Sequence, residues 1–274
     1  MSDTAQLALT EYLSASSAAG LLRELAGAHY VAAEQIEPNT GERYCFVEFC
    51  DSPLLTSPEL REDFLRALAA EFPWAESAVV CTSAHADLDL HWQRLLTYFL
   101  WTPGRLVPPP PNRAQVRPAT DLELPRLVNW LARSFTATAA QRAQRATDPA
   151  QLASDILAEP DRRSWISWAA AGPVGHATVL TGALDLIRGQ TFVELLDILV
   201  EPGREDHRQR AVELLATVRN YAASVQKPLL SNVVHLSGDL EAVSRDWQVA
   251  DSLYRTGWTE YDVYYSAELP RSAH

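Results

Sequence analysis

The sequence predicts an α/β fold in two lobes, with a mixed central sheet flanked by helices. Short apolar strands alternate with amphipathic helices along most of the chain, as in layered α/β proteins. The segment TPGRLVPPPPNR, residues 102–113, contains four consecutive prolines, which neither a helix nor an inner strand tolerates. We therefore expect an N-terminal α/β lobe over residues 1–101, a proline-rich linker over 102–113, and a second domain over 114–269.

The first lobe contains a hairpin, a helix and a strand. The segments HYVAAEQIEP and RYCFVEFC flank NTGE like the arms of a hairpin. Residues 57–72 predict an amphipathic helix with Ser57 as N-cap and Pro58 in its first turn. SAVVCTS, residues 77–83, predicts a short buried strand. This order repeats part of the second domain, so we interpret the first lobe as a degenerate, non-catalytic copy of half of it.

The second domain predicts the order β-α-α-β-β-β-α-β-α-β. Its first strand and two helices are expected over 114–120, 121–135 and 148–160. Two strands around the Gly172-Pro173 turn precede the apolar strand TFVELLDILV, residues 191–200. The remaining elements are a helix at 206–225, a strand at 228–236, a helix and turn at 241–258, and a strand at 261–269.

Composition excludes several classes of protein. The chain of 274 residues has a net charge of −12, which disfavours nucleic acid as a partner. No apolar run is long enough to span a membrane, and the N-terminus lacks a signal peptide's basic region. The three cysteines predict buried thiols in a reducing cytoplasm. We expect no metal, because His85 and His91, near Asp87 and Asp89, are interpreted as a polar loop.

Three segments of the second domain resemble the GNAT (GCN5-related) N-acyltransferases. VRPAT with its following helix resembles the family's opening strand and helix, and ELLDILVEP with the next helix resembles the donor-binding strand and helix. ADSLYRTGWTEYDVYY, residues 250–265, resembles the closing A-x-x-LY…GF pattern. The donor loop departs from the family's R/Q-x-x-G-x-G/A, since residues 206–211 keep only its final small residue, Ala211. The resemblance thus implies a GNAT fold with a degenerate pyrophosphate loop.

The resemblance also implies roles in acyl transfer from a pantetheine thioester to an amine. It places the backbone contacts of the pantetheine arm on Ile198, Leu199 and Val200. Glu194 lies where several family members have a general base, and burial in an apolar strand would raise its pKa toward that role. Tyr254 matches the family's general acid for the departing sulfur. A strand-end surface glutamate and a core tyrosine are the alternative interpretations of these two residues.

Four further residues are candidates for the acceptor side. His176 and His235 are each expected mid-strand or at a strand end, where a structural role is the default. Asp197 faces away from Glu194 in a regular strand unless a bulge turns it. Trp168 belongs to an aromatic group that would line an acceptor pocket or pack in the core, with Trp165, Trp247, Trp258, Tyr261, Tyr264 and Tyr265.

The loop at 203–210 lacks the glycines that let a backbone approach a pyrophosphate. Arg204, Arg208 and Arg210 are predicted to reach outward to a single phosphate or to an acidic protein surface, aided by the helix N-terminus. Glu205 and Asp206 oppose an anion there, and the alternative interpretation is a solvated helix start with charges of both signs. The donor is therefore expected to be acyl-CoA or carrier-protein-bound phosphopantetheine. A carrier protein would dock on the less acidic half, because residues 1–111 have a net charge of −9 and the remainder −3.

These observations predict an N-acyltransferase, with a small-molecule amine as the expected acceptor. The single lysine among 23 basic residues indicates a GC-rich genome, and we expect a bacterial enzyme of secondary metabolism. Two alternatives stay open: a catalytically inactive binding or scaffold protein of GNAT-like fold, and a transferase that uses aminoacyl-tRNA.

Overall fold

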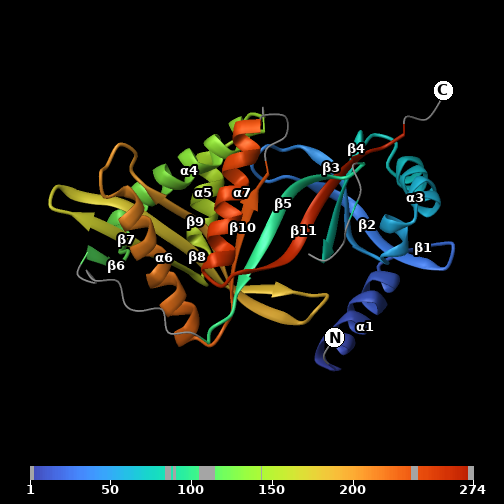
Figure 1. Cartoon of the computed structure of the whole chain (residues 1–274), viewed down its shortest axis with the longest axis horizontal. Coiled ribbons are helices and arrows are strands. Elements are labelled where there is room, and N and C mark those ends of the chain that lie inside the picture. Colours follow the sequence, from blue (N-terminus) through green and yellow to red (C-terminus); the bar gives the residue numbers. More distant parts are fainter. Residues whose placement is uncertain are drawn as a thin grey trace. The chain divides into compact units, whose positions relative to one another are not determined.

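The computed structural model describes residues 3–83, 88, 91–104, 115–142, 144–235 and 240–270, without the side chains of 240–247 (Figure 1). The chain divides into two compact units. Unit 1 comprises Met1–Phe99, Asp185–Gln190 and Asn232–His274, and unit 2 comprises Leu100–Leu184 and Thr191–Ser231. Most of the expected linker lies outside the described residues.

Unit 1 contains a mixed sheet with strand order β1-β2-β3-β4-β11-β5. Strands β1 (Leu22–Leu25), β2 (Ala28–Ile36) and β3 (Arg43–Cys50) form an antiparallel meander. Strand β4 (Ser77–Ser83) then joins β3 in parallel, after α2 (Pro53–Thr56) and α3 (Pro58–Glu71). The unit also contains α1 (Asp3–Ala18), α7 (Leu240–Arg255), β11 (Thr259–Glu268) and most of β5 (Gln93–Trp101).

The core of unit 1 lies between its sheet and α3. Alternation along the strands places Cys45, Val47, Val80 and other small apolar residues on one face, where they pack with Phe64 and other residues of α3. Ser57 is the N-cap of α3, as expected, but its side chain makes no capping hydrogen bond. The first 100 residues are therefore α/β in structure.

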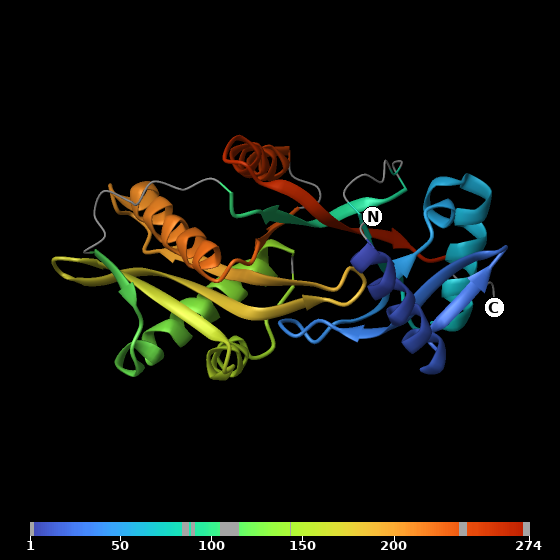
Figure 2. The ribbon, with the colours of Figure 1, turned by 90° about the horizontal axis from the view of Figure 1, so that it is seen from below.

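Unit 2 has the strand order β10-β9-β8-β7-β6, with helices on both faces. Figure 2 shows α6 (His207–Ser224) on one face and α4 (Leu124–Gln141) and α5 (Pro149–Ala158) on the other. The strands are β6 (Val116–Pro118), β7 (Arg162–Ala169), β8 (Gly172–Asp185), β9 (Gln190–Val200) and β10 (Leu229–Val234). A short 3-10 turn, η2 (Asp121–Glu123), precedes α4. Leu127, Trp130 and Leu131 of α4 pack with α5 and Ile166 of β7.

The compact units are divided differently from the domains that the sequence predicts. Strand β11, at the C-terminal end, pairs antiparallel with β4 over seven residue pairs, from Asp262–Ser83 to Glu268–Ser77. Unit 1 therefore includes the last helix and strand of the expected second domain, and the tip of the β8–β9 hairpin, Asp185–Gln190. The predicted class, α/β with a mixed sheet flanked by helices, is confirmed. None of the described helices is long and apolar enough to cross a membrane.

Candidate active site on strand β9 and helix α6

Strand β9 changes the side to which its backbone hydrogen bonds point. The N–H of Val193 donates to the carbonyl of Pro228, just before β10, at 2.9 Å. The N–H of Glu201 donates to the carbonyl of Val174, on β8, at 2.8 Å. Residues eight apart in a regular strand point their N–H groups to the same side. An irregularity of the bulge type therefore lies between Val193 and Glu201.

The parallel ladder between β9 and β10 is short. It consists of the pairs Leu229–Val193 and Leu230–Glu194, although both strands continue beyond these residues. On the other side, β8 approaches β9 so closely at Gly175 that an added Cβ would lie 2.5 Å from the carbonyl oxygen of Leu199. The second half of β9 therefore lies directly against β8 at Gly175.

Glu194 stands at the last pair of this short ladder. Its side chain is half-buried, and burial raises the pKa of its carboxyl group above the ordinary value. A raised pKa moves a carboxylate toward the basicity that proton abstraction near neutral pH requires. Glu194 lies six residues before Val200, and in a regular strand this spacing would place both side chains on the same face. An irregularity within that interval would break the alternation, so the spacing alone does not show that the two residues share a face.

The predicted pantetheine contacts fall on the second half of β9. Leu199 packs against the core of α4 and α5, and Val200 is buried. Ile198 is half-buried. Their side chains therefore contribute to packing, and only their backbone groups are candidates to pair with a ligand. That role stays a prediction.

Asp197 and His176 form a buried polar cluster on the α4 side of the sheet. His176 Nε2 lies 3.1 Å from Asp197 Oδ2, and Asp197 Oδ1 accepts a hydrogen bond from Ser134 of α4 at 3.1 Å. His176 Nδ1 lies 3.1 Å from the Thr178 hydroxyl, and the imidazole stacks on Trp130 with ring centroids 5.4 Å apart. His176 is 0% exposed, which agrees with the structural role that is the default for this residue, and a contact with an acceptor stays a prediction.

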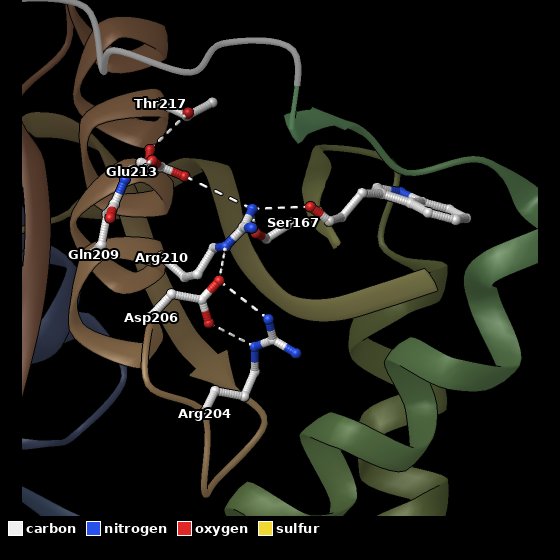
Figure 3. Close-up of polar contacts among 8 residues, drawn as sticks. Ser167, Arg204, Asp206, Gln209, Arg210, Glu213 and Thr217 are labelled. Atoms are coloured by element: carbon white, nitrogen blue, oxygen red, sulfur yellow. Dashed lines mark hydrogen bonds and ion pairs between the residues drawn. The ribbon is translucent and has the colours of Figure 1, made fainter. Parts of the chain in front are cut away.

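The loop before α6 contains a closed network of charges instead of arginines that reach outward (Figure 3). Arg204 makes two hydrogen bonds to the Asp206 carboxylate, at 2.8 and 3.0 Å. Arg210 donates its Nε–H to the same carboxylate at 2.9 Å and an Nη1–H to the carbonyl of Trp168 at 2.8 Å. These two guanidinium groups hold the pKa of Asp206 at about 2.

The expectation that all three arginines point outward is therefore corrected. Arg210 is buried because it bonds inward to β7, and Arg204 is bound to the N-cap residue of α6. Arg208 is exposed, so its contact with a phosphate stays a prediction. Ala211 is half-buried in the second turn of the helix.

Trp168 lies beside this network. Its backbone carbonyl accepts from Arg210, and the Arg117 guanidinium covers its ring at 4.8 Å from the centroid. The indole Nε1 is buried and has no hydrogen-bond partner among the described residues. One cation thus lies over the ring and another binds the backbone of Trp168, and a contact with an acceptor stays a prediction.

Tyr254 belongs to unit 1 and is described with it. It is 43% exposed, packs edge-on against Phe99 at 5.5 Å, and donates its hydroxyl hydrogen to Glu260. Glu260 also accepts from Arg94, at 3.2 and 3.3 Å. Burial and the Glu260 carboxylate raise the pKa of the phenol to about 12. Tyr254 therefore keeps its proton at neutral pH, in an exposed position.

His235 has a structural environment within unit 1. Its backbone N–H donates to the carbonyl of Leu95 at 2.8 Å, and its Nε2 lies 2.8 Å from the hydroxyl of buried Thr97. Both contacts tie His235 to β5. To contact an acceptor amine through Nε2, the ring would have to give up its hydrogen bond with Thr97.

The other aromatic residues mostly serve packing. Trp258 and Tyr265 are buried, Trp165 packs on Tyr221, and Tyr264 stacks on Phe46. Tyr261 donates to Asp185 at 2.6 Å. The side chain of Trp247, and most of the loop with His85, Asp87 and Asp89, lie outside the described residues. Within the part that the structure describes, no group of three metal-ligating side chains is present.

Two residues of the site were missed by sequence reasoning. Trp130 packs on His176 and donates to Glu201 at 2.5 Å, but its contacts come from a distant helix. Asp206 was interpreted only as a charge opposing an anion. Its four-residue spacing from Arg210 on a helix is a signal that predicts an ion pair.

Comparison with solved structures identifies the fold. The chain is similar to a functionally unknown conserved protein from Staphylococcus epidermidis, with 12% identity, coverage of 90% of this chain and 93% of that chain, and a TM-score of 0.52. It is also similar to a GCN5-related N-acetyltransferase from Sphaerobacter thermophilus, with 12% identity, coverage of 90% and 78%, and a TM-score of 0.50.

No protein-family model and no curated protein sequence matches the chain. The likeness is therefore one of structure, and it agrees with the strand–helix–strand arrangement of β9, α6 and β10 described above. The chain has the fold of the GCN5-related N-acetyltransferases, as its sequence predicts.

Proposed function

We propose that this protein is an N-acyltransferase that moves an acyl group from a pantetheine thioester to an amine. The observation that carries the proposal is Glu194, a half-buried carboxylate with a raised pKa at the end of the β9–β10 ladder of a GNAT fold. The short ladder and the irregularity in β9 support a donor that pairs with backbone groups of Ile198, Leu199 and Val200. We propose acyl-CoA or carrier-protein-bound phosphopantetheine as the donor.

In the proposed step, the amine nitrogen attacks the thioester carbonyl carbon. Glu194 accepts the proton that the amine loses, the C–N bond forms, and the C–S bond breaks. The sulfur leaves as a thiolate and takes a proton from Tyr254, the proposed general acid. Tyr254 donates its hydroxyl hydrogen to Glu260, so the hydroxyl must break this hydrogen bond before it can donate to the sulfur.

The proposed acceptor is a small-molecule amine, and the net charge of −12 disfavours an aminoacyl-tRNA donor. We propose a cytoplasmic location, since Cys45, Cys50 and Cys81 are free and burial raises the pKa of each thiol.

A second candidate is a non-catalytic binding protein of the same fold. The closed ion network of Arg204, Asp206 and Arg210 favours this alternative, because it occupies the loop where a donor phosphate is expected.

The deciding experiment combines binding with turnover. A donor at 100 times its Kd stabilises the folded protein by about 2.7 kcal/mol, so acyl-CoA or an acyl carrier protein should raise the Tm. Release of free thiol in the presence of a panel of amines then measures turnover. Thiol release that depends on an amine and is lost in Glu194→Gln supports the enzyme. Stabilisation without turnover for every amine favours the binding protein.

A further inference from the structure

A carboxylate of the chain itself stands at the N-terminus of α6, although the first turn of the helix contains no acidic residue. Helix N-termini attract anions through free N–H groups and the helix dipole. Asp206 is the N-cap residue of α6, and its carboxylate places a negative charge at this position, where it binds arginines and makes no hydrogen bond to the N–H groups of the helix. The loop therefore contains, within the chain, the type of group that a bound phosphate would otherwise supply.

Both cations next to Asp206 bind its carboxylate. Arg204 donates hydrogen bonds to the carboxylate from Nε and Nη2, and Arg210 donates one to the same carboxylate from the helix (Figure 3). Arg210 is only 8% exposed, and it also holds the Trp168 carbonyl. A phosphate that recruited Arg210 would have to break these contacts, and separating a buried charge from its partners is unfavourable.

The surroundings of Arg210 strengthen this arrangement. Glu213 Oε2 lies 4.0 Å from Arg210 Nη1, and this second carboxylate is buried. Gln209, one turn earlier on the helix, donates a hydrogen bond to Glu213 Oε1 at 3.0 Å. A diphosphate placed here would face two carboxylates, the half-buried Asp206 and the buried Glu213, and like charges at short distance repel. The charged side chains of this loop therefore pair with one another.

We infer that the protein recognises its donor by the pantetheine arm and thioester, without binding the nucleotide pyrophosphate of CoA at α6. This inference rests on the proposed acyl transfer. The Asp206 carboxylate occupies Arg204 and Arg210, the cations beside the helix N-terminus that a pyrophosphate would need. Two sources present the same pantetheine chemistry, a carrier protein and a free pantetheine thioester, and the donor series below distinguishes them.

The first test compares one acyl group on pantetheine, on CoA and on a carrier protein, with wild-type protein. We expect kcat/KM for acyl-CoA to lie within about threefold of that for acyl-pantetheine, since the nucleotide adds no transition-state contact. A much higher value for the carrier protein would identify it as the source. A preference for CoA over pantetheine of about 100-fold or more would overturn the inference while leaving acyl transfer intact.

The second test removes the internal anion. Asp206→Asn and Asp206→Ser should free Arg204 and create a preference for CoA over pantetheine of about fivefold or more. Serine is a good N-cap residue, so Asp206→Ser keeps the helix start. Glu205→Gln is the matched control, because it removes the same charge from an exposed neighbour. An equal gain in Glu205→Gln would attribute the effect to net charge and contradict the role of the network.

The third test does not depend on turnover. Adenosine 3′-phosphate 5′-diphosphate, the part of CoA that contains its pyrophosphate, is titrated into the protein by calorimetry. Wild type should show no binding at millimolar nucleotide, whereas Asp206→Ser should gain binding that weakens with salt. Tight binding to wild type that Asp206→Ser leaves unchanged would overturn the inference, even if no amine acceptor is ever found. Absence of turnover with every donor would instead count against the proposed function alone.

Discussion

His176 on β8 and Asp197 on β9 lie side by side in the core of unit 2, with Nε2 and Oδ2 3.1 Å apart. Ser134 of α4 donates to the other carboxylate oxygen at 3.1 Å, so three elements meet at Asp197. The same strand contains Glu194, three residues earlier. This cluster therefore ties the strand with the proposed base to the helix layer beneath it.

Replacing His176 with leucine should destabilise unit 2 by about 2–4 kcal/mol, because Asp197 and Thr178 lose a buried partner. The free energy of unfolding from urea denaturation measures the effect. The double variant His176→Leu/Asp197→Leu should be less destabilised than the sum of the single changes, since neither partner is left alone. A single variant as stable as wild type would show that the pair contributes nothing.

Glu194→Gln should lower turnover by about 10²–10⁴-fold, the usual effect of losing a general base. It should also change how stability depends on pH. The folded-state pKa of Glu194 is raised, so the native protein binds more protons than the unfolded chain above about pH 4. Wild-type stability therefore decreases as pH rises through the interval between the two pKa values.

Glutamine does not titrate, so the free energy of unfolding of Glu194→Gln relative to wild type should increase from pH 4 to pH 7. Denaturation at a series of pH values measures this difference. A difference that is constant with pH would argue that the Glu194 pKa is not raised.

Tyr254→Phe should reduce turnover by about 10–1000-fold with little change in Tm. The ring is 43% exposed and keeps its packing on Phe99, while Glu260 keeps Arg94. Tyr221→Phe, on α6, removes the same atom from a half-buried ring and is the control. Equal rates for Tyr254→Phe and wild type would remove Tyr254 from the mechanism.

Gly175→Ala should destabilise the protein by about 3 kcal/mol or more, because the new methyl group would meet backbone atoms that cannot move aside. Its Cβ would lie 2.5 Å from the carbonyl oxygen of Leu199 and 3.0 Å from Cα of Val200. Gly104→Ala is the control, since no atom lies within 4 Å of that added Cβ. Thermal unfolding compares the two. Equal Tm values would mean that β8 and β9 can separate at little cost.

Local patterns were sufficient to predict much of the secondary structure. The apolar run at 191–200 and the amphipathic stretch at 206–225 correspond to β9 and α6, because burial imposes periods of 2 and 3.6 on neighbouring residues. The resemblance of residues 250–265 to a GNAT pattern allowed the fold itself to be predicted. Helix α1 and strand β5 were not predicted.

The sequence by itself thus determined the fold class, the strand–helix junction at 200–207 and the presence of a carboxylate on β9. Only the tertiary structure decided that β11 pairs with β4, about 180 residues away, since the sequence of a strand does not specify its distant partner. The tertiary structure also decided the direction of Arg210. The sequence places Asp206 and Arg210 four residues apart, which predicts their ion pair. The Trp168 carbonyl that Arg210 also binds belongs to β7, and only the packing of α6 on the sheet brings these two residues together.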